Sequence, residues 1–153
     1  MEAVAVIHQK LYQRGTDSNI NVSSYLTELT HKLTMSFGYS ERDLQLDLDT
    51  ENLILDIERA TPLGLIINEL VTNSLKHAFE DVEHPRLSIS LQKQATEICL
   101  SVSDNGIGLP ADLDVKKSNS FGLKLINLLT EELNGHLEMT NENGSHWKIV
   151  FPA

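Results

Sequence analysis

Glu69, Asn73, Lys76 and His77 are polar residues that can share one face of a helix predicted over residues 61–80. Residues three or four apart lie on the same side of an α-helix, and Asn73 falls about 40° from Glu69 around the helix axis. Amide and carboxylate oxygens suit a magnesium ion, and a lysine can neutralise phosphate charge. The face therefore offers groups for a metal ion and for phosphate, although alone it is equally the solvated side of an amphipathic helix.

A second group of residues lies further along the chain, where residues 104–110 read Asp-Asn-Gly-Ile-Gly-Leu-Pro. Asp104 is a lone carboxylate at the end of a predicted strand, and Gly106 and Gly108 let the backbone turn sharply and approach a ligand. Alone, Asp104 could equally be a turn-capping aspartate. Together with the helix face, the segment predicts a nucleotide site without a P-loop, because the patterns GxxxxGK[S/T] and GxGxxG do not occur.

Hydrophobic periodicity defines the elements that must position these residues. It predicts helices at 2–14, from Ser23 or Ser24 to Phe37, at 61–80 and at 120–134, and strands at 44–48, 53–57, 87–91, 98–102, 136–140 and 146–151. Gly38 and Gly135 should end two of the helices, and Pro62 should lie in the first turn of the long one. The residues of the long helix that should face a sheet are Leu63, Ile67, Leu70, Val71, Ser74 and Ala78.

Turns are predicted at residues 50–52, between the first two strands, and at Asn143-Gly144, between the last two. A loop from Leu109 to Ser120 has no periodic pattern. Strand pairs that alternate with helices predict an α/β fold with one mixed, mostly antiparallel sheet that helices cover on one face.

Composition narrows the function. A length of 153 residues suits a single domain, and the net charge of −10 argues against nucleic-acid binding, which needs a basic surface. The single cysteine, Cys99, excludes an intramolecular disulfide and favours a reducing, cytoplasmic setting, where it should be an inert residue. No secretory signal opens the sequence and no apolar run has the length of a membrane span, so no membrane contact by this chain is expected.

The motifs resemble those of a known superfamily, the ATPases of gyrase, heat-shock chaperones, histidine kinases and mismatch-repair proteins. Residues 67–79 resemble its N box, 104–108 its G1 box, 120–125 its G2 box, and Gly144-Ser145 its last motif. The motif sequences are most similar to those of sensor histidine kinases of the second HisKA-type subgroup. Residues 7–12 resemble the end of that subgroup's dimerisation region, so the resemblance covers essentially the whole chain.

This resemblance implies a fold and a division of the chain. The fold is the two-layer α/β sandwich known as the Bergerat ATP-binding fold, preceded by a short helical stub. Residues 1–18 would be the end of the dimerisation-region helix and a linker, and residues 19–153 would be the catalytic ATP-binding domain. The loop from Leu109 to Ser120 would be its mobile lid.

The resemblance also implies roles for the residues at the motif positions. Asp104 would accept a hydrogen bond from the adenine amino group, and Asn73 would hold Mg²⁺. Lys76 would neutralise phosphate charge, and His77 would line the sugar or base. Whether Glu69 acts as a catalytic base stays open. Gly106 and Gly108 would be lid hinges, and the N–H groups at Gly122 would face the phosphates. The remaining residues expected to bind ATP are Ser120, Phe121, Leu123 and Ser145.

The implied function is the ATP-binding catalytic domain of a two-component sensor histidine kinase. It would position Mg-ATP for phosphoryl transfer to a histidine outside this chain. Expected partners are the dimerisation/phosphoacceptor domain of the same kinase, a response regulator, and a second copy in a full-length homodimer. Two alternatives stay open: another ATPase or serine kinase of the superfamily, of the anti-sigma-factor type, and a nucleotide-sensing or protein-binding module that has lost its chemistry.

The sequence departs from the histidine kinase pattern at several points. The lid carries no Phe-rich F box, Gly122 stands where many G2 boxes have two glycines, and the Trp-x-Glu signature of the related HWE group is missing. His8 is followed by Gln9 rather than an acidic residue, so it is expected to be an ordinary helix residue. In the subgroup that the chain resembles, the phosphoacceptor histidine lies in a long helical region upstream, so the resemblance implies that it lies there, in a longer protein.

Overall fold

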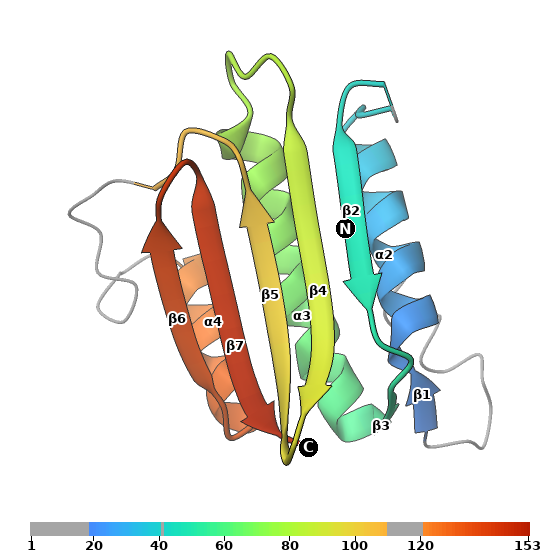
Figure 1. Cartoon of the computed structure of the whole chain (residues 1–153). Coiled ribbons are helices and arrows are strands. Elements are labelled where there is room, and N and C mark those ends of the chain that lie inside the picture. Colours follow the sequence, from blue (N-terminus) through green and yellow to red (C-terminus); the bar gives the residue numbers. More distant parts are fainter. Residues whose placement is uncertain (1–18, 41, 110–120) are drawn as a thin grey trace.

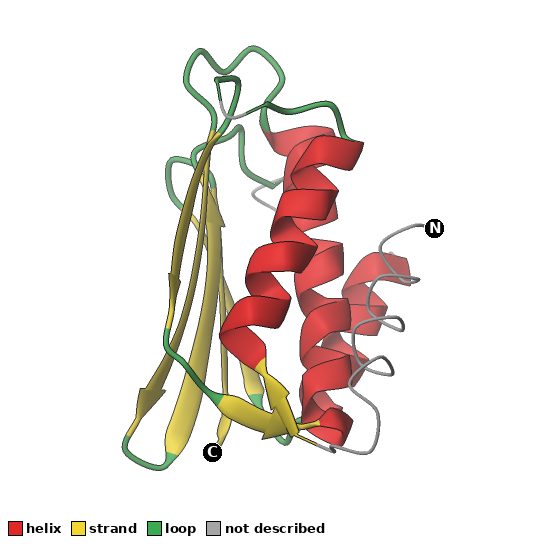
Figure 2. Ribbon diagram, turned by 90° about the vertical axis from the view of Figure 1, so that its right-hand side faces the viewer, coloured by secondary structure: helices red, strands yellow, loops and turns green. Residues whose placement is uncertain are grey.

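A computed structural model describes residues 19–40, 42–109 and 121–153 (Figure 1). Seen from the side, these residues form two layers, a sheet and a layer of helices packed on one of its faces (Figure 2). The predicted two-layer α/β sandwich is confirmed. The predicted helix at 2–14, the stub at 1–18 and most of the loop at 109–120 lie outside the described residues.

The elements follow one another in an order close to the predicted one. They are β1 (Asn19–Asn21), α2 (Val22–Ser36), β2 (Gln45–Thr50), β3 (Ile54–Asp56), α3 (Ile57–Asn73), the π-helical turn η1 (Ser74–Ala78), β4 (Arg86–Gln94), β5 (Glu97–Asp104), α4 (Phe121–Glu132), β6 (His136–Asn141) and β7 (Ser145–Pro152). Among the described residues, the main sheet has the order β2-β4-β5-β7-β6. The β2–β4 pair is parallel and the other pairs are antiparallel, as predicted for a mixed, mostly antiparallel sheet.

The partner of β3 differs from the prediction. β3 does not continue the main sheet beside β2; it pairs with β1 in a small antiparallel ribbon, with Ile20 opposite Leu55. The residue before β3 also contacts the neighbouring segment: the Leu53 carbonyl accepts a 2.9 Å hydrogen bond from the Val22 N–H. Leu53 and Leu55 are buried. Alternation in the sequence identified both strands, but it carries no information on which strand is their neighbour.

The core lies between the helices and the covered face of the sheet. All the residues of α3 and η1 that were predicted to face the sheet are buried, namely Leu63, Ile67, Leu70, Val71, Ser74 and Ala78. On the sheet side they meet residues of alternate positions, including Leu87, Ile89, Leu100 and Ile149, each at most 1% exposed. Burial of one such side chain contributes about 1.5–3 kcal/mol, so this layer fixes the rotation of α3 on the sheet.

Two helix ends differ in detail from the prediction. α3 begins at Ile57 rather than Thr61, so Pro62 lies in the second turn and removes the hydrogen bond to the carbonyl of residue 58. After α4, the left-handed residue is Asn134 (φ 57°) and not Gly135. Gly135 is needed for another reason: a Cβ there would lie 2.8 Å from the carbonyl oxygen of Val150 on β7. The stop at Gly38, with φ 83°, is confirmed.

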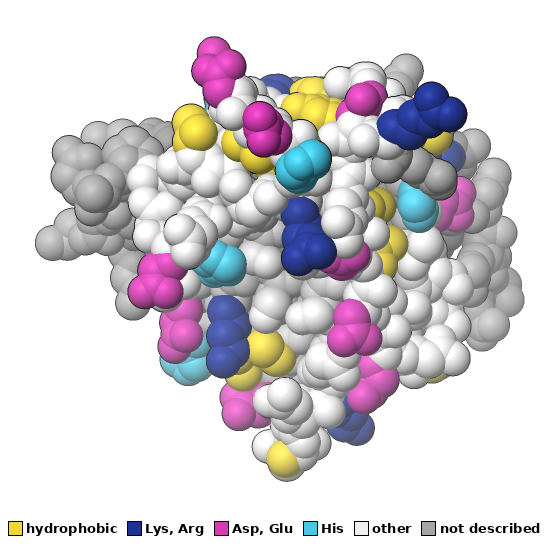
Figure 3. Space-filling model, turned by 45° about the horizontal axis from the view of Figure 1, so that its top comes forward, with side chains coloured by type: hydrophobic (Ala, Val, Ile, Leu, Met, Phe, Trp, Pro, Cys, Tyr) yellow, Lys and Arg dark blue, Asp and Glu magenta, His cyan; other side chains and the backbone are white. Residues whose placement is uncertain are grey.

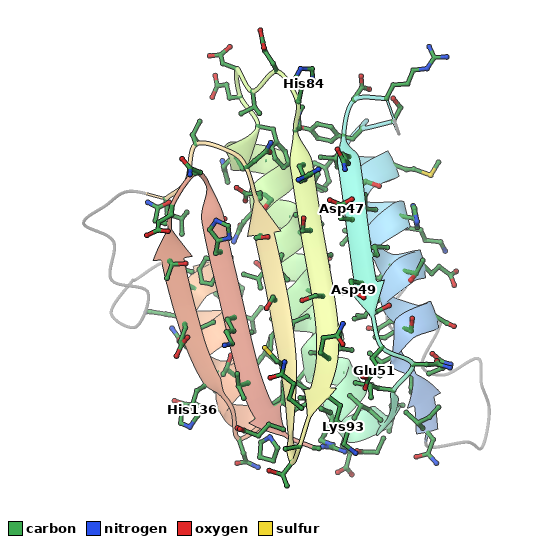
Figure 4. All side chains as sticks on the ribbon, viewed as in Figure 1. Asp47, Asp49, Glu51, His84, Lys93 and His136 are labelled. Carbon is green, nitrogen blue, oxygen red and sulfur yellow. The ribbon has the colours of Figure 1, made fainter. Side chains whose placement is uncertain are left out.

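The face of the sheet that carries no helices is polar (Figure 4). Asp47 and Asp49 lie along the edge strand β2, and Asp47 pairs with Arg86 of β4 at 3.2 Å. Charged residues on an edge strand discourage pairing with another chain. Among the described residues, no helix is both long and apolar enough to cross a membrane.

Candidate functional site

The end of α3 is not α-helical. Residues Ser74–Ala78 form the π-turn η1, in which hydrogen bonds span five residues and each residue turns through a smaller angle than in an α-helix. The side chains beyond Asn73 are therefore rotated from the positions that α-helical spacing predicts. His77 stays on the side of Asn73, whereas the ammonium group of Lys76 lies 6.0 Å from the ring centroid of Phe37, at the end of α2.

Asp104, the last residue of β5, is held by three different segments. It is 5% exposed and accepts four hydrogen bonds from described residues. Oδ1 accepts from the backbone N–H groups of Gly106 (3.0 Å) and Ser145 (3.2 Å). Oδ2 accepts from the hydroxyls of Ser74 and Ser145, both at 2.7 Å. These bonds compensate the cost of burying a carboxylate and fix its direction.

The glycines of the loop are required by close approaches. Gly106 lies against the end of η1, where the Ile107 N–H donates a 2.9 Å hydrogen bond to the Ala78 carbonyl, and a Cβ on Gly106 would collide with that carbonyl. A Cβ on Gly144 would collide with the backbone of Asp104. Gly108 has a left-handed φ of 77°. Their role as lid hinges stays a prediction.

A cleft lies between these segments, at the end of the molecule where α3 and β5 finish. Its lining is formed by Asn73, Ser74, His77, Ala78, Asp104, Gly108, Leu109, Ser145 and Trp147. The unoccupied space is about 300 Å³, a volume that includes the open mouth. The cleft has apolar walls, with the carboxylate of Asp104 at its side.

Five of the residues predicted for the site meet in this cleft: Asn73, His77, Asp104, Gly108 and Ser145. The prediction missed Ser74, Ala78, Leu109 and Trp147, which also line it. The alternation of β7 could have found Trp147, because it places Trp147 on the same face as Ser145. Ser74 was predicted only to face the sheet, and it does so by bonding to Asp104.

Other predicted residues do not line the cleft. Glu69 is half-buried one turn before Asn73, and Lys76 lies over Phe37. At the start of α4, Phe121 is 79% exposed, Gly122 is half-buried, and Leu123 belongs to the core at 7% exposure. Gly106 does not line the cleft but packs against Ala78, which does. Ser120 lies outside the described residues.

The surface at this end of the molecule carries charges of both signs. In Figure 3, histidine, basic and acidic side chains are interspersed across it. Electrostatic attraction of an anionic ligand would therefore come from particular side chains and backbone N–H groups rather than from a basic patch.

Comparison with known proteins identifies the family. Residues 58–153 match the model of the family described as histidine kinase-, DNA gyrase B-, and HSP90-like ATPase. Residues 1–37 match a second model, described as histidine kinase. The chain therefore belongs to the family of histidine kinase-, DNA gyrase B- and HSP90-like ATPases, and it carries an ATP-binding catalytic domain of the kind found in two-component histidine kinases.

Sensor histidine kinases are among its relatives. PdtaS of Mycobacterium tuberculosis is 28% identical over 157 residues, which cover 100% of this chain and 31% of that protein. PdtaS of Mycolicibacterium smegmatis is 39% identical over 141 residues, which cover 90% of this chain and 28% of that protein. The chain thus spans less than a third of the length of these relatives.

Solved structures of histidine kinases share the fold. The histidine kinase domain of the blue-light-activated kinase EL346 from Erythrobacter litoralis has a TM-score of 0.87 at 22% identity, over 99% of this chain and 71% of that one. The catalytic domain of the histidine kinase ThkA has a TM-score of 0.67 at 23% identity, over 88% of this chain and 93% of that one.

Proposed function

We propose that this chain binds Mg-ATP in the cleft and positions the γ-phosphoryl group for transfer to a histidine outside the chain, as the catalytic domain of a sensor histidine kinase. The observation that carries the proposal is that Asn73 and Asp104, from distant parts of the sequence, line the same cleft. One supplies an amide for a metal ion and the other a carboxylate that can read a base.

Asp104 selects adenine in this proposal. A carboxylate accepts a hydrogen bond from the exocyclic amino group of adenine, whereas guanine would present a carbonyl oxygen at the corresponding position and be repelled. A hydrogen bond to a charged group contributes about 1.5–3 kcal/mol, enough to set base preference. Ala78, Leu109 and Trp147 supply apolar surface for the ring.

The acceptor positions of Asp104 are already occupied, which sets a condition on base binding. A carboxylate offers about four acceptor positions, and the bonds from Ser74, Gly106 and Ser145 fill them. The backbone N–H groups cannot turn away, but a serine hydroxyl can rotate. The adenine amino group therefore takes the position of a serine hydroxyl on Oδ2.

The phosphates would extend from the cleft past Asn73 toward the start of α4. Mg²⁺, when bound, would neutralise and orient the phosphate oxygens. The chemistry of the donors fits this ion, because the amide oxygen of Asn73 is a hard ligand at a half-buried position. The N–H groups in the first turn of α4, around Gly122, have no partner within the helix and suit phosphate oxygens. Lys76 would have to leave Phe37 to reach them.

The attacking histidine would be supplied by a dimerisation/phosphoacceptor domain of the same kinase. The histidine kinase match of residues 1–37 supports this partner. A response regulator would then take the phosphoryl group from that histidine, and the full-length protein would act as a homodimer in the cytoplasm. Catalysis by this chain would come from orientation of the nucleotide and from charge neutralisation.

The proposal is tested by phosphoryl transfer in trans. The chain is incubated with γ-labelled Mg-ATP and a separate histidine-bearing dimerisation fragment from a PdtaS relative. We expect base-stable, acid-labile label on the fragment, and none with Asn73→Ala. Tight ATP binding without transfer to any such fragment would contradict the kinase function and favour the nucleotide-sensing alternative.

Glu69 keeps the ATPase and serine kinase alternative open. It lies one helical turn before Asn73, where a carboxylate could activate water or a serine hydroxyl. Steady-state release of phosphate from ATP separates the alternatives. A kinase domain without its histidine should release phosphate very slowly. Fast release that Glu69→Gln abolishes would favour the hydrolase, and label on a serine substrate would favour the serine kinase.

A further inference from the structure

Asn141, the last residue of β6, binds both polar groups of a single residue in the glycine loop. Its Oδ1 accepts a 3.2 Å hydrogen bond from the Leu109 N–H, and its Nδ2 donates to the Leu109 carbonyl. Only an amide side chain offers an acceptor and a donor in this arrangement. Leu109 is thereby held to β6 much as a strand residue is held by its neighbour.

The contact between Asn141 and Leu109 requires glycine at position 108. A Cβ on Gly108 would collide with Oδ1 of Asn141, and Gly108 has a left-handed φ of 77°, which side chains disfavour. Glycine at this position therefore does two things: it lets the chain turn and it makes room for the amide of Asn141. The loop and the β6 end are complementary in shape as well as in hydrogen bonding.

The contact bears on the cleft because Gly108 and Leu109 line it, whereas Asn141 does not. The hairpin of β6 and β7 makes hydrogen bonds to two residues that line the cleft. Ser145, which pairs with Asn141 across the hairpin, bonds to Asp104, and Asn141 itself bonds to Leu109. One rigid hairpin thus sets the distance between the base-reading carboxylate and the apolar wall at Leu109.

We propose that Asn141 is a positioning residue of the nucleotide site: it holds the Gly108–Leu109 wall at the spacing from Asp104 that a purine ring requires. This inference rests on the proposed function. Its consequence is that loss of the amide weakens nucleotide binding although Asn141 does not touch the nucleotide. Both hydrogen bonds lie at an exposed loop, so the stability of the fold depends little on them.

The test compares Asn141→Ala, Asn141→Asp and a control, Thr140→Ala, a substitution at the preceding exposed residue of β6. Mg-ATP binding is measured by calorimetry on the whole chain. We expect both Asn141 variants to bind about three- to tenfold more weakly, the equivalent of about one hydrogen bond, and the control to bind within about twofold of the wild type. The thermal unfolding midpoint should move little in any of the three.

Amide hydrogen exchange at Leu109 separates the two hydrogen bonds. Asn141→Ala removes the acceptor of the Leu109 N–H and should accelerate its exchange. Asn141→Asp keeps that acceptor and loses the donor to the Leu109 carbonyl, so the N–H should stay protected while nucleotide affinity still falls. A purely structural role would change affinity and unfolding midpoint together.

A double-mutant cycle checks the contact with Gly108. Gly108→Ala should weaken Mg-ATP binding more in the wild type than in Asn141→Ala, because the collision with Oδ1 is absent in the second background. Additive losses would contradict the contact. Unchanged affinity in Asn141→Ala despite faster exchange at Leu109 would overturn the positioning role alone. A wild-type chain that binds no nucleotide would overturn the proposed function and this inference together.

Discussion

Ser74 and Asp104 are joined by a 2.7 Å hydrogen bond between the serine hydroxyl and the carboxylate, and both side chains are buried, at 4% and 5% exposure. The bond connects the π-turn at the end of α3 to the end of β5. Asn73 precedes Ser74 directly, so the same contact fixes the proposed metal ligand relative to the proposed base-reading carboxylate. The two halves of the site are thus joined by one side-chain pair.

Replacement of Ser74 should lower the stability of the fold and strengthen nucleotide binding. Ser74→Ala removes one hydrogen bond to a charged group and should lower the free energy of unfolding by about 1–3 kcal/mol. It also frees an acceptor position on Asp104, so we expect the Kd for Mg-ATP to fall about two- to fivefold, a fraction of the roughly 1.4 kcal/mol that a tenfold change represents. Denaturant unfolding and calorimetry measure the two effects.

Thr30→Val is the matched control for this variant. It removes another buried hydroxyl, whose 2.7 Å bond to the Leu26 carbonyl lies within α2. It should cost about 1 kcal/mol of stability and leave Mg-ATP affinity unchanged. A loss of affinity in Ser74→Ala would show that Ser74 assists the base instead of competing with it.

Gly106 is predicted to be intolerant of any side chain. Gly106→Ala would drive a Cβ into the backbone carbonyl of Ala78, so β5 and η1 would have to separate. We expect a loss of about 3 kcal/mol or more, in the range of overpacking and strain, with weaker Mg-ATP binding. Chemical denaturation measures the loss.

Gly38→Ala is the control for Gly106→Ala, because it replaces a glycine without causing a steric collision. Gly38 has a φ of 83°, but a Cβ there meets no atom within 4 Å. The variant should therefore lose only about 1–2 kcal/mol, the penalty for a left-handed backbone, and bind Mg-ATP normally. Equal losses in the two glycine variants would contradict the role of Gly106 as a contact with η1.

The sequence predicted those parts of the fold that depend on local pattern. The buried stripe of α3 is a consequence of helical spacing, and Asp104 ends an alternating strand, so the pattern located both. Helical spacing could not place Lys76 over Phe37, because it assumes an α-helix and the π-turn at Ser74–Ala78 rotates the side chains beyond Asn73. The expected role of Lys76 at the phosphates stays a prediction. The first turn of α3 precedes the predicted start, because proline is typical of a first turn and Pro62 lies in the second.

Contacts between distant segments that no motif marks could not be predicted. The pairing of β3 with β1 depends on tertiary neighbours rather than on local alternation. The same holds for the site: Asn141 bonds to Leu109 across the fold, and Ser145 reaches Asp104 from another strand. The motif resemblance named Ser145 but not Asn141, because a residue that acts through the backbone of another carries no local chemical signature.

Tyr25 should set the alkaline limit of stability. Burial raises the pKa of its hydroxyl, and this oxygen has no hydrogen-bond partner among the described residues. Above a pH of about 10 the unfolded state releases this proton and the folded state retains it, so the free energy of unfolding falls as pH rises.

Tyr25→Phe removes both the ionisable group and the buried hydroxyl that has no hydrogen-bond partner among the described residues. Near neutral pH it should be neutral or stabilising by up to about 1 kcal/mol, because an unpaired buried hydroxyl is lost. Its stability should decline less than that of the wild type between about pH 9.5 and 11. Denaturation curves across this range measure both. Parallel declines in the two proteins would show that Tyr25 ionises freely in the fold.

Asn73 should govern the magnesium dependence of nucleotide binding. Asn73→Ala removes the proposed metal ligand but leaves Asp104 and the apolar walls intact. We expect wild-type affinity for ATP to be at least about tenfold higher with Mg²⁺ than with EDTA, and the variant to show the same weak affinity in both. A variant that keeps the full magnesium effect would remove Asn73 from the metal site.

The central claim is that Asp104 reads adenine, and calorimetric titration of Mg-ATP into the wild type and Asp104→Asn tests it most directly. The serine hydroxyls can rotate to accept from the new amide, so the variant should still unfold cooperatively. The amide would, however, present N–H groups to the adenine amino group. We predict micromolar-range binding for the wild type and no measurable heat for the folded variant. Equal affinity in both proteins would contradict the account.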